Sequence, residues 1–429
     1  MLKLKGSIKV SGDKSISHRA LVLSAMSIGK STISNLLESD DVMRTLNNLR
    51  ELGIKIEKKN NKWIVFGNGT NGFMEPNKVL DCGNSGTTAR LMIGAVSSNS
   101  IKCTFTGDDS LSKRSMSRVT KHLEKIGADI HLTKGDYLPL MINGSDKLLP
   151  IKHVMEKASA QVKSAIILAG LNIHGRTTII ESTKTRDHTE RLMKYLNINF
   201  KNKKIKNGGK QIELNGPYEI RSKNINVASD PSSASFFIVG ALITPNSKVT
   251  LKDVMLNPTR TAFIKILKKM GGKIKIKKTK KICGENVGDI TAAFSNLKGL
   301  DIPASHSALL IDEYPILSIA ASQASGRTIM NGLQELRHKE SDRITSIAFN
   351  LKKLGFRLNI KNNDLIIWGK TNKRIRNANI KTFNDHRIAM SFSILNIIYD
   401  NKLKIDNMKC IAISYPKFEN HLKLLLTEH

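Results

Sequence analysis

Apolar and polar positions follow a pattern that returns several times along this chain. An amphipathic stretch of helical periodicity ends in an apolar residue, usually followed by Gly or Asn, and two segments of alternating polarity come next, separated by a polar turn. Gly and Asn suit the left-handed conformation that ends a helix, and the alternation predicts a β-hairpin. The copies are Leu46 to Gly67, Val119 to Gly144, Glu190 to Gly216, Phe263 onward, and Ser346 to Gly369.

The copies lie roughly 70 to 84 residues apart, which predicts about six units in 429 residues. We expect the sixth copy to be degenerate and to lie near Asn384 to Ile405. Units of this length are too long for a solenoid, so the pattern favours an α/β protein with two halves of three α+β units each. A composition change at Asn226 to Ser233 marks the expected boundary, and the opening strand, Met1 to Val10, can belong to either half.

Composition then limits the classes of function. The hydrophobic share of 40% is enough for sizeable cores, and the formal net charge of +33 raises nucleic acid as a partner. Only 5% of the residues are aromatic, so stacking platforms for bases are scarce. Much of the charge is Lys in exposed-looking runs, such as 201–206 and 273–281. We interpret it as solvated surface that also attracts acidic substrates, and keep nucleic-acid binding as a remote alternative.

The cysteines and the apolar runs predict the compartment. Cys82, Cys103, Cys283 and Cys410 are isolated and lack the spacing of metal ligands, which favours buried thiols in a reducing cytoplasm. The first apolar run begins only at Ala20, which argues against a signal peptide, and no run is long enough to span a membrane. We therefore expect a cytoplasmic protein without a membrane segment.

Two polar clusters precede apolar helices in the first half. Ser11 to Arg19 combines a Gly, cations and hydroxyls behind a short strand, and it predicts either an anion site at a helix N-terminus or an ordinary helix cap. Asp81 to Thr88 offers small residues, hydroxyls and an amide. It predicts a second anion cradle, or alternatively an N-cap made by Thr87 or Thr88.

Further charged clusters come later. Ile311 to Pro315 places carboxylates in an apolar setting, either as a cap or as groups whose pKa the site exploits. If Arg337 to Arg343 is helical, Lys339 and Arg343 lie one turn apart on one face, with Glu340 beside them. The other clusters are Lys113-Arg114, Ser159 to Ser164, Thr185 to His188, and Asn384 to Arg387. Many cations, few carboxylates and no metal constellation suit an enzyme for two small, multiply anionic substrates, without a metal or nucleotide cofactor.

Ordered motifs over nearly the whole chain resemble those of the 5-enolpyruvylshikimate-3-phosphate synthases, a family of enolpyruvyl transferases. They are "GDKSISHR", "GNSGTTAR", "SAQVKSA", "TRDHTE", "NPTR", "IDEYP", "KESDR" and "DHRIAM". The resemblance implies a two-domain inside-out α/β barrel with six βαβαββ-type units, three per domain. Residues 1–12 with 230–429 would form the first domain and 13–229 the second, with the active site in the cleft between them. It also implies a monomer that needs no cofactor.

The implied reaction transfers the enolpyruvyl group of phosphoenolpyruvate to the 5-hydroxyl of shikimate 3-phosphate, with release of phosphate. It proceeds by addition and elimination through a tetrahedral intermediate. The residues carried over as catalytic are Asp312 as base, Glu340 as proton donor, and Lys14. Those for shikimate 3-phosphate are Lys14, Ser15, Arg19, Ser159, Ala160, Gln161, Arg186, Asp312 and Lys339. Those for phosphoenolpyruvate are Lys14, Asn84, Gly86, Thr87, Arg114, Gln161, Arg343 and Arg387.

The chain departs from the family pattern in a few places. Ser115 stands where Pro is common, Ser229 where Gly usually precedes the hinge motif, and Ile413 where some members carry a Lys to phosphoenolpyruvate. Gly86 is the small residue of herbicide-sensitive members, so glyphosate should compete with phosphoenolpyruvate. The nearest rival activity, enolpyruvyl transfer to UDP-N-acetylglucosamine, needs a different first motif and a reactive loop Cys, whose pattern neither Cys82 nor Cys103 matches.

Overall fold

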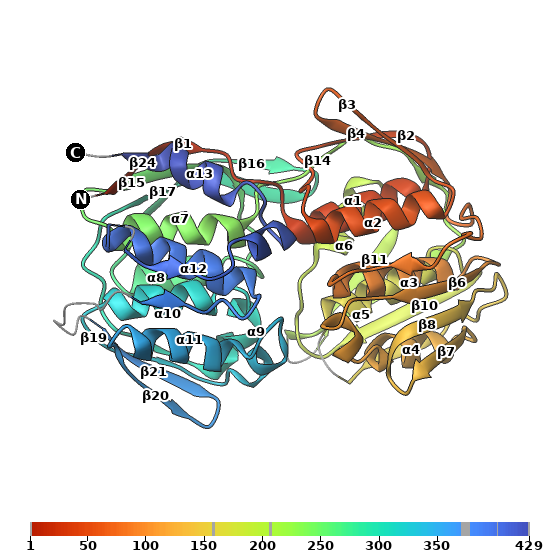
Figure 1. The fold of residues 1–429 in the computed structure, drawn as a ribbon. Coiled ribbons are helices and arrows are strands. Elements are labelled where there is room, and N and C mark those ends of the chain that lie inside the picture. The colour runs from red at the N-terminus through yellow and green to blue at the C-terminus, as the bar shows by residue number, and fades with distance from the viewer. Residues whose placement is uncertain (1, 157–158, 206–207, 370–377, 401, 428–429) are drawn as a thin grey trace. The chain divides into compact units, whose positions relative to one another are not determined.

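The structure is a computed structural model that describes residues 2–156, 159–205, 208–369, 378–400 and 402–427. It divides into two compact units (Figure 1). Unit 1 comprises Met1–Ser11, Ala228–Lys281 and Asn286–His429, and unit 2 comprises Gly12–Val227 and Ile282–Glu285. Both are mixed α/β structures, in line with the expected class. None of the described helices is long and apolar enough to cross a membrane.

Unit 2 alternates helices with short strands. Its helices are α1 (Lys14–Ala25), α2 (Asp40–Glu51), α3 (Gly86–Ser97), α4 (Ser117–Glu124), α5 (Ala160–Gly170) and α6 (His188–Tyr195), with the 3-10 helix η1 (Leu111–Lys113). Its strands are β2 (Ser27–Ser34), β3 (Lys55–Lys59), β4 (Lys62–Asn68), β5 (Leu80–Asp81), β6 (Lys102–Thr106), β7 (Asp129–Lys134), β8 (Tyr137–Asn143), β9 (Lys152–Met155), β10 (Gly175–Glu181), β11 (Phe200–Lys204), β12 (Lys210–Gly216), β13 (Ile220–Arg221) and β14 (Ile225–Asn226).

Unit 1 is built from the same kinds of element. Its helices are α7 (Pro231–Ile243), α8 (Ala262–Lys269), α9 (Ser307–Leu310), α10 (Tyr314–Gln323), α11 (Arg343–Lys353), α12 (His386–Ile398) and α13 (Phe418–Leu425), with the 3-10 helices η3 (Ala304–His306), η4 (Gln334–His338) and η5 (Lys409–Ile413). Its strands are β1 (Lys3–Ile8), β15 (Lys248–Met255), β16 (Lys273–Ile282), β17 (Glu285–Ala293), β18 (Asp301–Ile302), β19 (Gly326–Met330), β20 (Arg357–Lys361), β21 (Asp364–Gly369), β22 (Asn379–Ile380), β23 (Lys404–Ile405) and β24 (Leu426–Thr427).

Except for the pair β22-β23, the sheets of both units combine a parallel strand pair with an antiparallel hairpin. In unit 2 the strand orders are β13-β2-β4-β3, with β14 also on β2, then β5-β6-β8-β7 and β11-β12-β10-β9. In unit 1 they are β16-β17-β15-β1-β24, β18-β19-β21-β20 and the short pair β22-β23. The opening strand β1 pairs in parallel with β15 and antiparallel with β24, which assigns it to unit 1.

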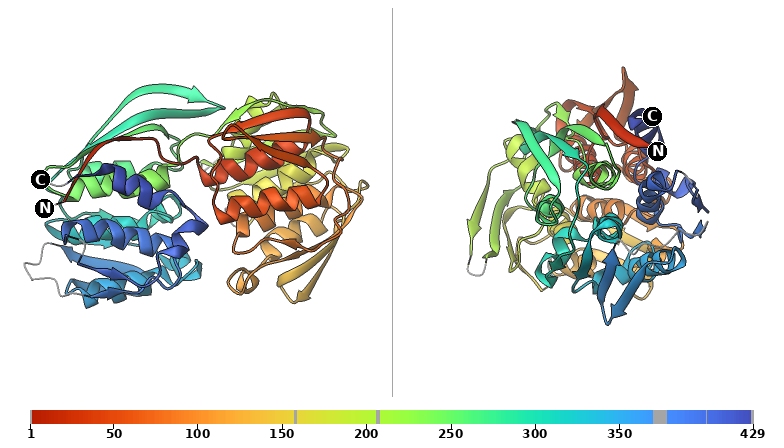
Figure 2. Two further views of the ribbon diagram at one scale, coloured as in Figure 1. Left: turned by 45° about the horizontal axis from the view of Figure 1, so that its top comes forward. Right: turned by 90° about the vertical axis from the view of Figure 1, so that its left-hand side faces the viewer.

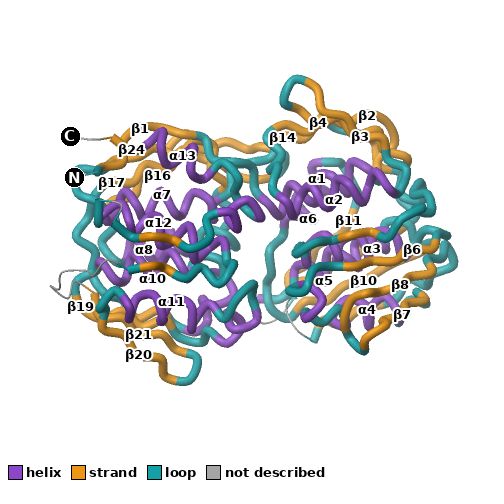
Figure 3. The backbone as a smooth tube through the Cα atoms, viewed as in Figure 1, coloured by secondary structure: helices purple, strands orange, loops and turns teal. Residues whose placement is uncertain are grey.

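The predicted repeats are confirmed in five places, each a helix followed by a hairpin: α2-β3-β4, α4-β7-β8, α6-β11-β12, α8-β16-β17 and α11-β20-β21. A left-handed residue lies two or three positions after the end of each of these helices, with φ between 62° at Asn197 and 96° at Gly127. The region of the expected sixth copy holds α12 and then β23, which pairs in parallel with β22. The purple helices and orange strands of Figure 3 make this alternation visible.

Apolar helices form the cores, and amphipathic helices cover them. Every residue of α7 is buried, as expected for a helix that is apolar all round. Helices α7, α10 and α12 contact one another in unit 1 and run side by side in Figure 1. In unit 2, α3 contacts both α1 and α5. Gly94 makes the α3–α5 approach possible, because a Cβ there would lie 2.4 Å from the carbonyl oxygen of Ala165.

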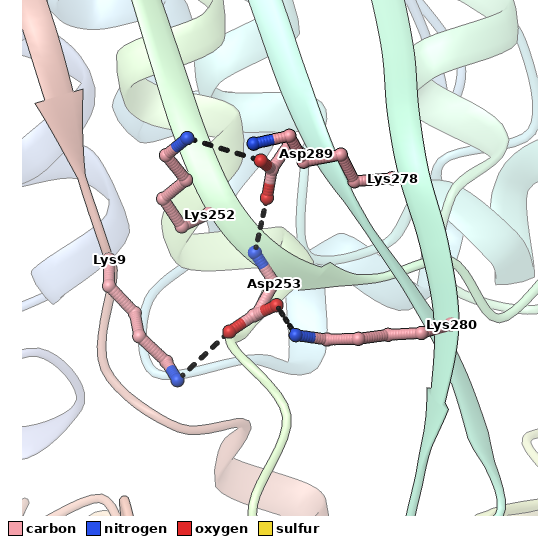
Figure 4. Close-up of a pocket in the computed structure, with 6 residues that line it drawn as sticks. All are labelled: Lys9, Lys252, Asp253, Lys278, Lys280 and Asp289. Atoms are coloured by element: carbon pink, nitrogen blue, oxygen red, sulfur yellow. Dashed lines mark hydrogen bonds and ion pairs between the residues drawn. The ribbon is translucent and has the colours of Figure 1, made fainter.

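A pocket of about 420 Å³ lies on the β1-β15-β17-β16 face of unit 1 (Figure 4). Asp253 lies at a bulge of β15, and its carboxylate accepts from Nζ of Lys9 at 3.1 Å and from Nζ of Lys280 at 2.7 Å. On the neighbouring strand Asp289 accepts from Nζ of Lys252 at 3.1 Å. This cluster therefore ties β1, β15, β16 and β17 together.

The cluster gives a testable dependence of stability on pH. The hydrogen bond from Lys280 lowers the pKa of Asp253, so its contribution to folding is complete above the unfolded value of about 4 and is lost as pH falls through the lower folded value. We expect Asp253→Asn to cost less than about 1 kcal/mol at neutral pH, because the pair is solvated. Denaturant unfolding at about pH 6 and about pH 3 should show this difference shrinking with acid. An equal difference at both pH values would contradict the assignment.

Candidate active site

Helix N-termini carry most of the predicted site residues. Asp13 caps α1 by accepting from the Ile16 N–H at 2.8 Å, Ser85 caps α3 by accepting from Thr88, and Ser159 caps α5 by accepting from Val162. Ser85 therefore takes the capping role that the sequence had suggested for Thr87 or Thr88. In each case one side-chain oxygen makes the cap, so the neighbouring polar side chains are not needed for capping.

Lys14 and Arg19, on successive turns of α1, are held by other parts of unit 2. Lys14 forms an ion pair with Asp41 at the start of α2. Arg19 is 4% exposed, and its guanidinium donates to the Ser15 carbonyl at 2.9 Å, the Ser164 hydroxyl at 2.8 Å and the Thr189 hydroxyl at 2.7 Å. The Ser164 hydroxyl in turn donates to the Ala160 carbonyl. The α1 motif is thus linked to α5 and α6.

A second group gathers at the start of α3. The Gln161 amide donates to the Thr87 hydroxyl at 2.8 Å, and its oxygen accepts from Arg90 at 2.9 Å. Arg90 also donates to the carbonyl of Gly86 at 3.3 Å. A Cβ at Gly86 would lie only 2.6 Å from Nη1 of Arg90, so the absence of a side chain at this position leaves space for the guanidinium.

The charges around Arg90 favour an anion. Burial, with the charges of Arg114 and Arg118, lowers the pKa of Arg90 to about 10. Arg114 donates to the Asn84 side-chain oxygen at 3.2 Å and so joins this end of α3. The carbonyl of Ser115, one of the departures from the family pattern, accepts from Arg90 at 3.3 Å.

Arg186 lies between β10 and α6 and is partly exposed. Its neighbours on both sides are fixed, because Thr185 donates to Glu181 at 2.7 Å and Asp187 accepts from Arg191 at 2.9 Å. The buried Lys163 pairs with Glu181, at the end of β10, at 3.0 Å and with Glu190, in α6, at 2.7 Å. The loop that presents Arg186 therefore rests on a buried charge network.

In unit 1, Arg343 is the centre of the predicted carboxylate cluster. It is 1% exposed, and it donates to Asp385 at 2.8 Å and to Glu340 at 2.7 Å, while its Nη1 lies 3.9 Å from Asp312. Arg387 lies 3.7 Å from the same Asp312 carboxylate and donates to the Asp312 carbonyl at 3.0 Å. The structure thus brings Asp312, Glu340, Arg343 and Arg387 together.

Lys339 does not lie on a helix with Arg343, contrary to the arrangement predicted if residues 337–343 were helical. It follows η4 in an extended conformation, and α11 begins only at Arg343, where Asp342 provides the cap. The one-turn spacing on a helix face is therefore wrong. Burial lowers the pKa of Lys339, and the positive charge of Arg343 adds to this, although Asp312 and Glu340 oppose it.

A buried network supports the segment that carries Asp312. The Ser232 hydroxyl donates to the Glu313 carboxylate at 2.5 Å and accepts from Arg260 at 2.8 Å, and Arg260 also pairs with Asp230 at 3.0 Å. Burial and the neighbouring Asp312 raise the pKa of Glu313. Ser229, which directly precedes Asp230, pairs its backbone with Val254 of β15. Ile413, the remaining departure, is partly buried in η5.

The cysteines bear on the rival activity. Cys82, Cys103 and Cys410 are buried, and burial raises the pKa of Cys103 to about 12 and that of Cys410 to about 11. Such thiols are poor nucleophiles at neutral pH. Cys283 is only partly buried, contrary to expectation, because it lies in a turn with φ of 45°.

Sequence reasoning missed three residues that hold the site together: Asp41, Arg90 and Asp385. Arg90 and Asp385 lie inside motifs that were recognised, but their partners Gln161 and Arg343 are distant in sequence. Nothing in the sequence distinguishes Asp41 from other acidic residues in the first turn of a helix.

Comparisons with known proteins agree over nearly the whole chain. A family model described as EPSP synthase (3-phosphoshikimate 1-carboxyvinyltransferase) matches residues 1–422. The 3-phosphoshikimate 1-carboxyvinyltransferase of Petrotoga mobilis is 44% identical over 419 residues, with 97% of this chain and 95% of the relative covered. That of Parvibaculum lavamentivorans is 43% identical over 416 residues, with 97% and 92% covered.

A solved structure of EPSP synthase from Acinetobacter baumannii superposes with a TM-score of 0.87 at 38% identity, covering 100% of this chain and 98% of the other. The mixed α/β fold described above is therefore similar to that of a solved EPSP synthase. Sequence and structure agree on one assignment: the chain belongs to the EPSP synthase family.

Proposed function

We propose that this chain transfers the enolpyruvyl group of phosphoenolpyruvate to the 5-hydroxyl of shikimate 3-phosphate, a step in the biosynthesis of chorismate and aromatic amino acids. The observation that carries the proposal is the unit 1 cluster, in which Arg343 contacts Glu340 at 2.7 Å and lies 3.9 Å from Asp312. Two carboxylates around one buried guanidinium provide acid and base groups beside a fixed positive charge. The full-length family match supplies the identity of the substrates.

The finer architecture belongs to this proposal. We take the two units as the domains of an inside-out α/β barrel with six βαβαββ-type units, three per domain, and the active site as the cleft between them. The domains would be residues 1–12 with 230–429, and 13–229. Support comes from the repeated helix–hairpin pattern and from the apolar helices at the core of each unit. The enzyme would be a cytoplasmic monomer without a cofactor.

Shikimate 3-phosphate would be held mainly by unit 2. Its phosphate would meet Ser159 and Arg186, and Lys14, Ser15, Arg19, Ala160 and Gln161 would complete the pocket. The α5 N-terminus adds a favourable dipole for an anion. Because Arg19 is held by Ser15, Ser164 and Thr189, it would reach the substrate already oriented. From unit 1, Asp312 would bind the hydroxyls of the shikimate ring, and Lys339 would also contact this substrate.

Phosphoenolpyruvate would be clamped by guanidinium groups. Arg114, Arg343 and Arg387 present planar forks, each of which matches a carboxylate or a phosphate in two bonds. Asn84, Gly86, Thr87 and Gln161 would line the same subsite, and Lys14 would contact both substrates. We add Arg90 as a residue that holds Gln161 and Gly86 in place, because it donates to both.

The chemistry needs one group that takes a proton and another that gives one. In the addition step the 5-hydroxyl oxygen bonds to C2 of phosphoenolpyruvate while Asp312 removes its proton and Glu340 protonates the methylene carbon. In the elimination step the methyl carbon returns a proton to the Glu340 carboxylate and the bond from C2 to the phosphate oxygen breaks, which releases phosphate. The guanidinium groups stabilise the charge that develops on the leaving phosphate.

Phosphate release tests the proposal directly. The purified chain should release phosphate from phosphoenolpyruvate only when shikimate 3-phosphate is present. Release that depends on UDP-N-acetylglucosamine instead would favour the sister transferase. If neither acceptor supports any release of phosphate, and the chain binds nucleic acid in a salt-sensitive manner in a gel shift, the remote alternative is favoured.

The geometry at Gly86 leads to a further prediction. Glyphosate should inhibit the chain, and added phosphoenolpyruvate should relieve the inhibition. In Gly86→Ala the new Cβ would displace Nη1 of Arg90 from Gln161, so the KM for phosphoenolpyruvate should rise about tenfold, the worth of one charge-assisted hydrogen bond. Gly135→Ala is a control for backbone strain alone, because Gly135 has φ of 62° and a Cβ there meets no atom within 4 Å; its KM for phosphoenolpyruvate should stay unchanged. Unchanged turnover at saturating glyphosate, or an unchanged KM in Gly86→Ala, would contradict these expectations.

A further inference from the structure

The hairpin β16–β17 belongs to both units. Its strands form the edge of the large unit 1 sheet, whereas its tip, Ile282–Glu285, is grouped with unit 2. The chain therefore passes from one unit to the other at this hairpin as well as after Ser11 and after Val227. In Figure 2 the hairpin is the long teal pair of strands.

The tip is a tight turn that the sequence makes possible. Cys283 and Gly284 have φ values of 45° and 85°, the pair of positive values that a two-residue type I′ turn requires. Gly284 also lies against α6, because a Cβ there would stand 2.6 Å from the carbonyl oxygen of Arg191. The turn thus brings the start of β17 directly onto α6.

Contacts of the tip run along the whole of α6. At the start of the helix, Glu285 Oε1 lies 2.8 Å from Nδ1 of His188, and its other oxygen lies 3.6 Å from Nε of Arg191. Glu285 and His188 are each 2% exposed. At the end of the helix, burial, together with the Cys283 thiol, raises the pKa of Tyr195 to about 12. The Cys283 sulfur also accepts from the backbone N–H of Asn226 at 3.2 Å.

These contacts bear on Arg186, which lies two residues before His188. Thr185 is held by Glu181, Asp187 by Arg191, and His188 by Glu285. Arg191 itself donates to the Gly284 carbonyl at 3.4 Å, so two of these three attachments depend on the hairpin tip. A buried charge-assisted contact of this kind restricts a loop more strongly than a solvated pair does.

We propose that Glu285 is a positioning residue for the binding of shikimate 3-phosphate: through His188 and Arg191 it fixes the segment that presents Arg186 to the substrate phosphate. This inference rests on the proposed function, in which Arg186 contacts that phosphate. It also assigns a role to the tip of the β16–β17 hairpin, Ile282–Glu285, which supports a binding segment of its own unit, unit 2.

The test compares two carboxylates on the same strand. Glu285→Gln keeps the shape of the side chain and removes its charge, whereas Asp289→Asn removes a charge from β17 at its pair with Lys252 (Figure 4). We expect Glu285→Gln to raise the KM and the calorimetric Kd for shikimate 3-phosphate about tenfold. The KM for phosphoenolpyruvate should change less than about twofold, and Asp289→Asn should leave the Kd for shikimate 3-phosphate unchanged.

Two further variants separate positioning from folding. Glu285→Asp keeps the charge and should restore most of the affinity for shikimate 3-phosphate. His188→Asn should weaken binding of shikimate 3-phosphate by itself, and adding Glu285→Gln should weaken it little further, since both act through one contact. Thermal unfolding of each variant sets the assay temperature well below its Tm.

The outcomes distinguish this proposal from the function on which it rests. If the unaltered chain binds shikimate 3-phosphate and turns it over, but Glu285→Gln only lowers the Tm or raises both KM values equally, the positioning role is overturned. If the unaltered chain neither binds nor converts shikimate 3-phosphate, the proposed function fails, and the positioning role fails with it.

Discussion

Replacing Asp312 by Asn should lower kcat about 10²- to 10⁴-fold, the usual worth of a positioned acid or base. The amide has nearly the same shape but cannot take the proton of the 5-hydroxyl. Arg343 retains its contacts with Asp385 and Glu340, so the cluster should stay assembled. The KM values should rise less than about tenfold, because the side chain can still form neutral hydrogen bonds.

Steady-state kinetics with both substrates measures this effect. Asp301→Asn is the matched control, since Asp301 is an exposed carboxylate of the same unit that bonds to Asn331 at 2.6 Å. Its kcat should equal that of the unaltered chain. A kcat within about twofold of normal in Asp312→Asn would remove Asp312 from the role of base.

The second large effect is expected at Arg343. Arg343→Met leaves Asp385 buried without the guanidinium that balances its charge, and removing one partner of such a pair costs about 3 to 5 kcal/mol of unfolding free energy. Burial alone would raise the pKa of Asp385, but the positive charge of Arg343 outweighs it and lowers that pKa. Loss of Arg343 should therefore reverse the direction of the shift.

Arg343→Lys separates charge from geometry. A lysine keeps one positive charge but cannot bond to Asp385 and Glu340 with a planar fork. Its KM for phosphoenolpyruvate should rise about 10- to 100-fold, with a smaller loss of stability than in Arg343→Met. Denaturant unfolding and kinetics check both, with the exposed Arg327→Lys as control. A normal KM in Arg343→Lys would show that Arg343 does not clamp phosphoenolpyruvate.

The repeated units could be predicted from sequence because each carries local signals. Helical periodicity, a residue such as Gly127 that tolerates positive φ, and two alternating strands are all encoded within about 25 residues. The region near Asn384 to Ile405 lacks these signals, and there the structure has α12 and the short strand β23. The conformation at Lys339 was harder to predict, because the cap at Asp342 starts α11 later than charge spacing suggests.

The contacts that support the site could not be predicted from local sequence patterns. Asp41 pairs with Lys14 across two helices, and Asp385 reaches Arg343 from 42 positions away in the chain. Glu285 approaches His188 only because the β16–β17 hairpin folds its tip onto α6. Local sequence patterns predict the helices, the strands and the motifs. The residues that orient each motif residue come from distant parts of the chain and depend on the tertiary fold.

Identification of the product tests the central claim most directly. Phosphorus and proton NMR of the chain incubated with shikimate 3-phosphate and phosphoenolpyruvate should show inorganic phosphate and a new vinyl ether in equal amounts. The vinyl ether should be identified by its methylene protons, on a product that keeps the 3-phosphate. Loss of phosphoenolpyruvate without a vinyl ether on shikimate 3-phosphate, or no reaction of the folded chain, would contradict the account.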